Sequence, residues 1–336
     1  MKQTDTIISI EPLDADVDES ADEAQEFEVR AAPIGAEHHG VRMDLAVAHL
    51  VPEFSRSYLQ QLIELGLVKL NGKLLGKPST KVKAGDVVTI ELRLTPQSQA
   101  FRPEPMDLSV LYEDDHVLVV DKPAGLVVHP APGNWSGTLL NGLLAHDRQA
   151  RLLPRAGIVH RLDKDTSGLM VVARSRAAMD GLVAAIAERE VSRQYIAVGC
   201  RAWSGPNQVV VQAPVGRDPR NRLRMAVVDL TVNAGKAART DIHLLGNASS
   251  ACFVRCVLHT GRTHQIRVHM ASIGHPLVSD QTYGGVVDAL MPRQALHAYK
   301  LAFLHPITGQ DLSFEAQPPS DFSTFLQEFG WDTIRL

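Results

Sequence analysis

The alternation of apolar and polar residues predicts a compact module near the N-terminus. Leu59, Leu62 and Ile63 recur at the spacing of one helical face, and Gly66 is a typical helix stop. The period then changes to the alternation of strands, interrupted by an Asn-Gly pair at 71–72 that is a strong hairpin signal. We therefore expect this module to combine helices with a small sheet.

Strand-like alternation dominates the larger, C-terminal part of the chain. The clearest exception follows Ser175, where Met179, Leu182 and Ile186 keep helical spacing. Runs of strands, rather than regular strand-helix repeats, predict an α+β fold with a mixed, largely antiparallel sheet flanked by helices and loops. The alternating segments lie within 110–130, 192–199, 207–215, 240–246 and 251–259.

Pattern and composition together divide the chain into four parts. We predict an acidic tail at 1–30, the small module at 38–95, a linker at 96–105 and the large domain at 106–330. The linker prediction rests on closely spaced prolines, scattered polar residues and the absence of any periodicity.

Length and composition indicate a globular protein. With 336 residues, of which 45% are hydrophobic, the chain can bury a substantial core in more than one domain. No apolar run is long enough to span a bilayer, and the N-terminus lacks a basic start followed by an apolar centre, so we expect a cytoplasmic protein. Cys252 and Cys256 alternate with apolar residues, which indicates reduced, structural thiols.

Charge is distributed unevenly along the chain. Residues 1–28 hold ten Asp or Glu and only Lys2, a local net charge of −9; because the whole chain carries −4, the remainder carries +5. Such an acidic segment, with few large apolar residues, is expected to stay unfolded. It is then a solubilising tail or, alternatively, a competitor of a polyanionic partner for the basic surface.

Basic side chains make the small module a candidate for gripping a phosphate backbone. Residues 40–94 hold eight Lys or Arg against five Asp or Glu. Charge alone favours an ordinary solvated face, so this interpretation needs other support. The candidate contacts, near the helix starts and the hairpin, are Arg42, Arg56, Lys69 and Lys73.

The stretch HRLDKDTSGLMVVA, residues 160–173, concentrates charge directly before an apolar strand. Asp163 falls in a loop between rigid elements, where catalytic groups often lie, and Arg161 and Lys164 would favour its ionised form if they are close in space. Such a carboxylate can act as a nucleophile or base. An Asp in a turn more often accepts local backbone hydrogen bonds, however, and Asp165 fits that structural role even better.

A second unusual patch, residues 259–284, holds four histidines together with Arg262 and Arg267. The five-residue spacing of the first three histidines places them on different faces of a helix or strand, which argues against a metal site. An arginine is the natural partner of an active carboxylate or of phosphates. We expect Arg267 on a helix opened by Thr263, and the sequence leaves open whether it meets Asp163.

At these residues the chain strongly resembles the RluA family of RNA pseudouridine synthases, and the small module resembles the S4 RNA-binding domain. The resemblance extends over about residues 40–320, with the motifs in the family's order. These motifs are KPAGLVVHP (122–130), AGIVHRLDKDTSGLMVVA (156–173), SRQYIAVG (192–199), GRTHQIRVHMASIGHPLVSDQTYG (261–284) and QALHAYKLAFLHP (294–306).

The resemblance implies a role for each matching residue. Asp163 is the essential catalytic carboxylate, Tyr195 stacks on the target base, and Arg267 pairs with the aspartate. Arg161 takes the space of the flipped nucleotide, and Arg262 is a further candidate RNA contact. The resemblance also implies isomerisation of specific uridines in large-subunit (23S) ribosomal RNA by a protein without cofactor or metal, which we expect to be a monomer. Whether Asp163 attacks C1′ or abstracts the C2′ proton stays open.

Two other classes of function remain. An RNA-binding or ribosome-assembly protein with an inert second domain would keep its cellular role without Asp163. A carboxylate-dependent glycosidase or nucleosidase would need a second acid at a set distance and would release free base.

Overall fold

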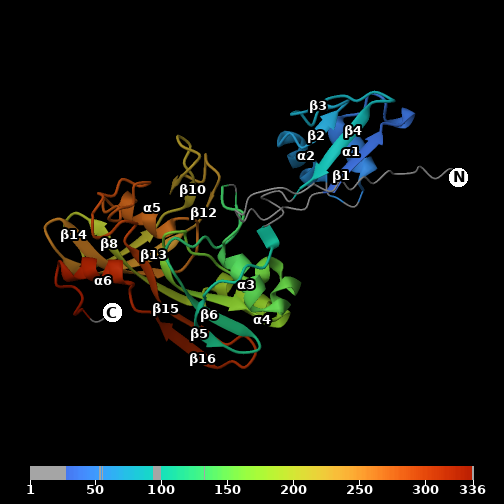
Figure 1. Cartoon of the computed structure of the whole chain (residues 1–336). Coiled ribbons are helices and arrows are strands. Elements are labelled where there is room, and N and C mark those ends of the chain that lie inside the picture. The colour runs from blue at the N-terminus through green and yellow to red at the C-terminus, as the bar shows by residue number, and fades with distance from the viewer. Residues whose placement is uncertain (1–27, 53, 55, 94–99, 132, 335–336) are drawn as a thin grey trace, which may run out of the picture. The chain divides into compact units, whose positions relative to one another are not determined.

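The chain folds into two compact units, Met1–Ala100 and Phe101–Leu336, each with its own hydrophobic core (Figure 1). Residues 1–27 of the predicted tail and 96–99 of the predicted linker lie outside the described residues. The computed structural model describes residues 28–52, 54, 56–93, 100–131 and 133–334.

The N-terminal unit packs two helices against one antiparallel sheet. Its elements are β1 (Glu28–Pro33), the short 3₁₀ helix η1 (Ala36–His38), α1 (Met43–Leu50), α2 (Arg56–Glu64), β2 (Val68–Leu70), β3 (Lys73–Leu74) and β4 (Val87–Leu92). The strands lie in the order β1-β4-β2-β3. Leu59, Leu62 and Ile63 are buried, which confirms the predicted helical face. Asn71 and Gly72 have φ angles of 50° and 77°, as a tight hairpin turn requires.

Strand β1 corrects the predicted start of the small domain. The sequence placed this start at residue 38 and assigned residues up to 30 to the tail. β1 instead pairs with β4 over its whole length, from Glu28 opposite Leu92 to Pro33 opposite Val87. Its charged residues resemble the preceding acidic segment, and the strand forms because it completes an edge of the sheet, which local propensity does not reveal.

The C-terminal unit is built on a nine-stranded sheet. Its strands are β5 (Ser109–Glu113), β6 (Val117–Lys122), β7 (Ser167–Ala173), β8 (Ser192–Cys200), β9 (Gln208–Gln212), β13 (Arg239–Asn247), β14 (Ala251–Leu258), β15 (Leu296–Leu304) and β16 (Asp311–Glu315). They lie in the order β5-β6-β7-β15-β8-β14-β13-β9, with β16 on β15. Among the described pairings of this sheet, only that of β7 with β15 is parallel. The predicted α+β fold with a mixed, largely antiparallel sheet is confirmed.

Helices cover both faces of this sheet. They are α3 (Leu139–His146), η3 (Arg148–Leu152), η4 (Pro154–Gly157), α4 (Arg176–Glu188), α5 (Gln265–Ser272) and α6 (Ser320–Gln327). Leu143 of α3 and Met270 of α5 belong to the core on one face, whereas Leu182 of α4 and Phe322 of α6 pack on the other. No helix among the described residues is long and apolar enough to cross a membrane.

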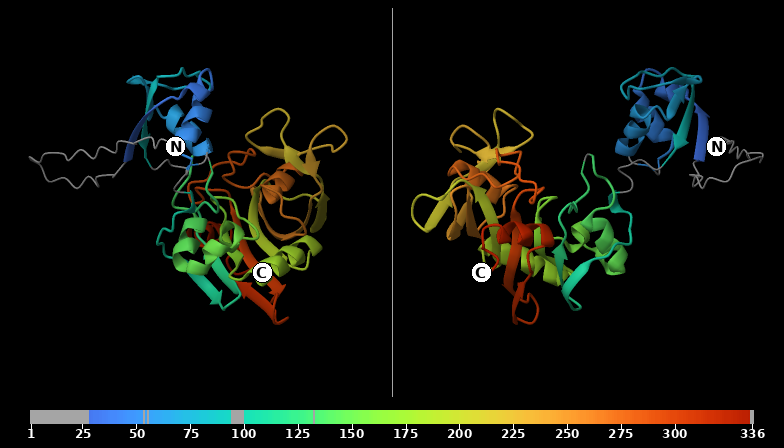
Figure 2. Two further views of the ribbon diagram at one scale, coloured as in Figure 1. Left: turned by 90° about the vertical axis from the view of Figure 1, so that its right-hand side faces the viewer. Right: turned by 60° about the vertical axis from the view of Figure 1, so that its left-hand side comes forward.

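A second, three-stranded sheet projects from the unit with its loops (Figure 2). It consists of β10 (Val215–Arg217), β11 (Met225–Val227) and β12 (Gly235–Lys236). Cys200, Cys252 and Cys256 are free and buried, which confirms the prediction of reduced, structural thiols.

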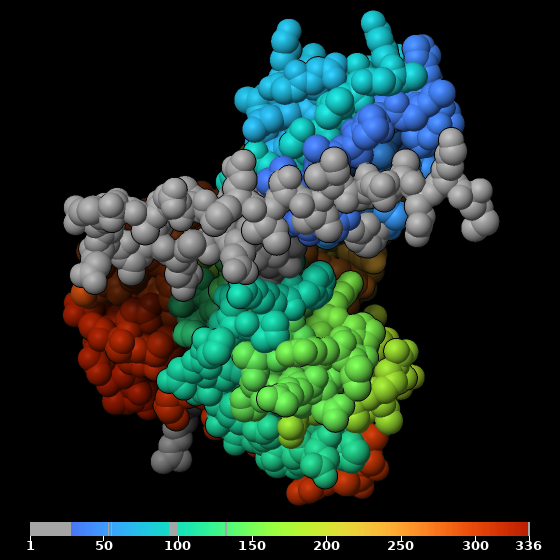
Figure 3. All heavy atoms as spheres, turned by 45° about the vertical axis from the view of Figure 1, so that its right-hand side comes forward, coloured from blue at the N-terminus to red at the C-terminus, as the bar shows by residue number. Residues whose placement is uncertain are grey.

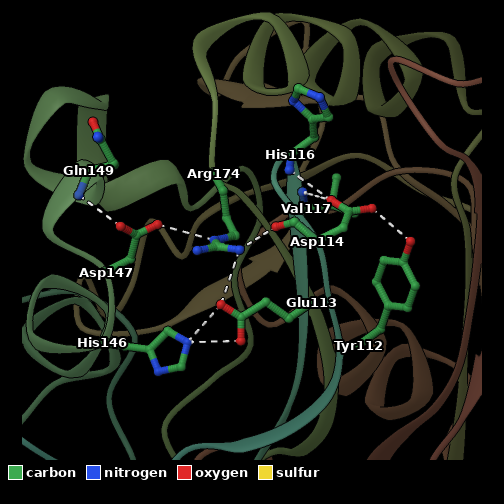
Figure 4. Close-up of polar contacts among 9 residues, drawn as sticks. All are labelled: Tyr112, Glu113, Asp114, His116, Val117, His146, Asp147, Gln149 and Arg174. Atoms are coloured by element: carbon green, nitrogen blue, oxygen red, sulfur yellow. Dashed lines mark hydrogen bonds and ion pairs between the residues drawn. The ribbon is translucent and has the colours of Figure 1, made fainter.

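Asp114 organises the turn between β5 and β6 (Figure 4). Its carboxylate accepts hydrogen bonds from the Tyr112 hydroxyl at 2.7 Å and from the backbone N–H groups of His116 and Val117 at 2.7 and 2.8 Å. The Nε2 atom of His305, in the turn between β15 and β16, lies 3.0 Å from the same carboxylate. Figure 3 shows the two turns beside each other, in teal and red. One carboxylate therefore joins two turns that lie near the beginning and the end of this unit's sequence.

Replacing Asp114 by Asn should lower the thermal stability of the C-terminal unit. Burial alone would raise the pKa of Asp114, but the hydrogen bonds from Tyr112, Val117 and His116 outweigh it and lower the pKa to about 2. Because this folded-state pKa lies below the ordinary value of 3.8, the stabilisation is present above that pH and is lost as the pH falls towards 2. Thermal unfolding at pH 7 should show a loss of about 1–3 kcal/mol.

The control is Asp311→Asn, which removes an exposed carboxylate from β16 and should unfold like the wild type. The deficit of Asp114→Asn should shrink as the pH is lowered below about 4. A deficit that stays constant across that range would contradict the assignment.

Candidate active site around Asp163

A buried ammonium group holds the loop that carries Asp163. Lys122, at the end of β6, is 1% exposed, and its Nζ donates three hydrogen bonds to main-chain carbonyls. The acceptors are Pro123, Leu126 and Lys164, at 2.8, 2.9 and 2.9 Å. Burial lowers the pKa of Lys122 to about 7. The turn after β6 and the Asp163 loop are thus fastened to one side chain.

Arg267 joins Asp163 to a second carboxylate. Its Nη1 donates to Oδ2 of Asp163 at 3.1 Å, while Nε and Nη2 donate to the two oxygens of Asp280 at 2.7 and 2.9 Å. The side chains of Asp163, Arg267 and Asp280 are 16%, 8% and 0% exposed. Burial alone would lower the pKa of Arg267, but hydrogen bonds and charge from both carboxylates outweigh it and raise the pKa. The bidentate pair fixes the guanidinium, and Asp163 accepts a hydrogen bond from its remaining nitrogen, Nη1.

His264 and Tyr283 complete the surroundings of this ion-pair network. The Tyr283 ring lies under the Arg267 guanidinium, 5.0 Å from its carbon to the ring centroid. Nδ1 of His264 is 2.8 Å from the Tyr283 hydroxyl, and its Nε2 lies 3.8 Å from Oδ1 of Asp163. Burial lowers the pKa of His264. A neutral imidazole with its proton on Nε2 would face the carboxylate, because the Tyr283 hydroxyl can donate to Nδ1.

The five predicted site residues of the C-terminal unit line one cavity of about 810 Å³. They are Asp163, Tyr195, Arg161, Arg262 and Arg267. Tyr195 is buried on β8, and burial raises its pKa to about 12; the positive charge of Arg193 opposes this rise and the negative charge of Asp163 adds to it. Among the described residues that line the cavity, Asp163 is the single carboxylate.

The predicted helix around Arg267 begins later than expected. We expected Thr263 to open it, but α5 starts at Gln265, after His264 in a left-handed conformation with φ 56°. The Gln265 side chain, whose oxygen accepts from the Thr260 hydroxyl and the Arg262 backbone N–H, fixes this entry to the helix. Turn geometry here depends on side-chain contacts that a period of apolar residues does not encode.

The four histidines of this patch have separate partners. His259 pairs with Asp241 at 2.9 Å, His269 lies between the Thr240 hydroxyl and a main-chain carbonyl, and His275 contacts the carbonyl of Cys200. Within the described part of the chain, no group of three or more His, Cys, Asp or Glu side chains is arranged to hold a metal ion.

The residues of the N-terminal unit that we predicted to contact RNA do not line this cavity, and three of them form ion pairs within their own unit. Arg42 and Arg56 both pair with the buried carboxylate of Asp44, at 3.0 and 2.7 Å, yet their side chains stay 47% and 49% exposed. Lys69 pairs with Glu91 at 3.2 Å. Lys73 is exposed. Asp44 thus positions two arginines side by side at the surface.

Sequence reasoning missed several residues of the site. Asp280 and Tyr283 lie inside a motif quoted for the family, but nothing in their spacing assigns them to Arg267. Lys122 stands in the KPAG turn, where a lysine is usually exposed. A charged residue between an apolar strand and a Pro-Gly turn was the one local signal available for Lys122.

Comparison with known proteins places this geometry in a family. Residues 116–272 match the family described as RNA pseudouridylate synthase, and residues 41–88 match the S4 domain. A protein of Neisseria meningitidis serogroup B named ribosomal large subunit pseudouridine synthase D is 48% identical over 84% of this chain and 77% of its own length. The chain belongs to the RNA pseudouridylate synthase family. It is therefore an isomerase that acts on RNA.

Further relatives extend this family match over nearly the whole chain. A Xanthomonas campestris pv. campestris protein, also named ribosomal large subunit pseudouridine synthase D, is 42% identical over 94% of this chain and 97% of its own length. Among solved structures, human RNA pseudouridylate synthase domain containing 1 superposes with a TM-score of 0.51, at 27% identity, over 64% of this chain and 86% of that one.

Replacing Asp280 by Asn should slow the synthase without unfolding it. The amide keeps the shape of the side chain but not the charge, so Arg267 is free to move towards Asp163 or away from the bidentate position. Because a small misplacement of a reacting group can cost up to about 10²-fold, we expect a loss of that order in the single-turnover rate. The measurement is pseudouridine formed in excess enzyme.

Asp311→Asn, which removes an exposed carboxylate of the same unit, is the matched control and should react like the wild type. A wild-type rate for Asp280→Asn would show that Asp280 does not position Arg267 for the reaction.

Proposed function

We propose that this synthase converts uridines of large-subunit ribosomal RNA to pseudouridine, with Asp163 as the reacting carboxylate. The observation that carries the proposal is that Asp163, the one carboxylate among the described residues of the cavity, is held by Arg267 among further arginines. A cavity rich in guanidinium groups suits a phosphate-linked substrate. The substrate itself is suggested by the relatives named for the large ribosomal subunit.

The target uridine must leave its stack before it can meet Asp163. Everting a base costs a few kcal/mol, and stacking on an aromatic ring returns about 1–3 kcal/mol. Tyr195 supplies that ring in the cavity, and Arg161, which is exposed at its edge, would take the vacated place in the RNA. Arg262 would contact the RNA backbone beside it.

Asp163 then breaks the bond between C1′ and N1 by one of two routes. It attacks C1′ as a nucleophile, or it removes the C2′ proton as a base. Uracil turns while bound, and C5 bonds to C1′. The Arg267 guanidinium, fixed from behind by Asp280, keeps the carboxylate aimed into the cavity throughout.

The two alternative functions are less well supported. A glycosidase or nucleosidase of the two-carboxylate type needs a second acid across the substrate, but Asp280 is fully buried behind Arg267 and Asp163 is the single acid among the described cavity residues. An inert domain would not need a buried guanidinium aimed at one loop carboxylate. Neither alternative would form pseudouridine, so detection of that product distinguishes them from the proposal.

Replacing Asp163 by Asn should abolish pseudouridine formation and leave RNA affinity close to that of the wild type. The carboxylate acts in the reaction, whereas the phosphate contacts come from the arginines. Pseudouridine is detected with a chemical tag specific for it, and affinity is measured by filter binding. Substantial remaining activity would refute the role of Asp163.

The substrate is tested by mapping pseudouridines in ribosomal RNA from cells with and without this protein. Loss of specific sites in the large-subunit RNA is expected. Sites lost only from transfer RNA would contradict the proposed substrate while leaving the chemistry intact. The expected cytoplasmic monomer belongs to this proposal and is tested by cell fractionation and by light scattering.

The S4 domain should contribute affinity rather than chemistry. Replacing Lys69 and Lys73 together by Gln removes two charges beside the hairpin, so the salt dependence of RNA binding should weaken by about one to two counterions. The rate at saturating RNA should be retained. Lys300→Gln, on β15 of the other unit, removes one partly exposed lysine as the control. An unchanged salt slope in the double variant would count against RNA binding by this face.

A further inference from the structure

Arg193 is a cavity residue that the proposed reaction has not yet used. It lies on β8 two positions before Tyr195, so both side chains leave the strand on the same face. Both line the cavity around Asp163, and each is 5% exposed. Arg193 therefore points a guanidinium into the deep part of the site.

This guanidinium lacks a protein partner. Within the described residues it makes no hydrogen bond or ion pair, and its Nε is fully buried without an acceptor. Arg267 has two carboxylates and Arg293, near the same loop, has Asp321. Burying a charged group without compensation is costly, and burial lowers the pKa of Arg193. The pocket thus holds a cation whose partner has to come from the ligand.

The neighbours of Arg193 accommodate its guanidinium without supplying a counter-charge. A Cβ at Gly261 would lie 2.9 Å from Nη1 of Arg193, so a glycine at this position accommodates the guanidinium. His160 lies close enough for the charge of Arg193 to reduce its pKa; burial and this charge together lower that pKa to about 3, so the imidazole is neutral. The charge of Arg193 interacts with the Tyr195 phenol, the Arg262 guanidinium and the His160 imidazole, none of which is a carboxylate.

Burial separates two classes of arginine in this cavity. Arg155, Arg161 and Arg189 are exposed, so they can meet the phosphates that stay at the surface of an RNA. Arg193 is buried beside the tyrosine ring, where an everted base would lie. This buried cation, which has no carboxylate partner among the described residues, is therefore placed for the base rather than for the backbone.

We propose that Arg193 is a further catalytic residue, which donates hydrogen bonds to a carbonyl oxygen of the everted uracil and stabilises the negative charge of the released ring. This inference rests on the proposed function. It assigns a chemical role to the guanidinium that the protein itself leaves unpaired.

The charge arises when the C1′–N1 bond breaks. Its electron pair stays on uracil, which becomes an anion with charge on N1, O2 and O4. C1′ either bonds to the Asp163 carboxylate or forms a double bond to C2′ after Asp163 has taken the C2′ proton. When C5 bonds to C1′, the ester oxygen leaves or the proton returns to C2′. C5 then loses its proton, N1 gains one, and the overall change is an isomerisation.

A fixed guanidinium can serve the ring before and after it turns. Half a turn about the axis through N3 and C6 exchanges N1 with C5 and O2 with O4. A donor that binds one carbonyl oxygen before the turn therefore meets the other afterwards. The cation also keeps the anion from leaving the site, because separating the two charges in a desolvated cavity is costly.

The test compares Arg193→Met and Arg193→Lys with the wild type in single-turnover reactions on one RNA. The control is Arg255→Met, on the neighbouring strand β14, where an arginine also has a buried, unpaired Nε but does not line the cavity. Removing one donor from a developing anion typically costs about 10²–10³-fold in rate, and we expect a loss of this order for Met with little change in RNA affinity. Lys should retain part of the rate, and Arg255→Met should react like the wild type.

A second substrate distinguishes anion stabilisation from a structural role. RNA carrying 5-fluorouridine at the target position releases a more stable ring anion, so loss of the fluorinated nucleoside should depend less on Arg193 than loss of uridine. Should the Met variant unfold, the Lys variant is compared on the two substrates in the same way.

Equal losses on both RNAs, a wild-type rate for Arg193→Met, or a loss that follows RNA affinity alone would each overturn the inference; the last would assign Arg193 to a phosphate. A wild-type protein that forms no pseudouridine would instead overturn the proposed function.

Discussion

The contact between Arg267 and two carboxylates is the interaction on which the site depends. Asp280 is fully buried and accepts two hydrogen bonds from the Nε–Nη2 edge of the guanidinium, so Nη1 is presented to Asp163 in a fixed direction. The two carboxylates also compensate the charge of this buried guanidinium, and burying a charge without such compensation is costly. The same set of contacts therefore stabilises the core and fixes the direction of the Asp163 carboxylate.

The sheet makes this arrangement possible by bringing three distant segments together. β7 receives the Asp163 loop, β15 lies parallel beside it, and β8 places Tyr195 and Arg193 on the face that α5 covers with Arg267. Lys122 and Arg293 hold the loop through its main-chain carbonyls. Because these bonds do not involve the Asp163 side chain, its carboxylate stays available to the cavity.

The arginines of the cavity differ in their exposure to solvent. The exposed arginines suit the phosphates of a structured RNA, and the buried Arg193 and Tyr195 suit a base removed from its stack. If a uracil carbonyl oxygen compensates the charge of Arg193, the same guanidinium would bind the nucleotide and stabilise the negative charge that develops on the ring. The small S4 domain contains a related contact, in which the buried carboxylate of Asp44 pairs with two arginines at the surface.

The sequence by itself determined the local elements and singled out the candidate residues that the structure brings to one cavity. The helix after Ser175, the hairpin at Asn71 and Gly72, and the α+β class follow from periods and turn residues, because these depend on neighbours along the chain. Only the tertiary structure decided that β1 joins the small sheet, that Asp280 stands behind Arg267, and that the buried Nε of Arg193 has no acceptor among the described residues. Asp163 and Arg267 are 104 residues apart, and such pairings arise from the packing of the whole sheet, which no local pattern encodes.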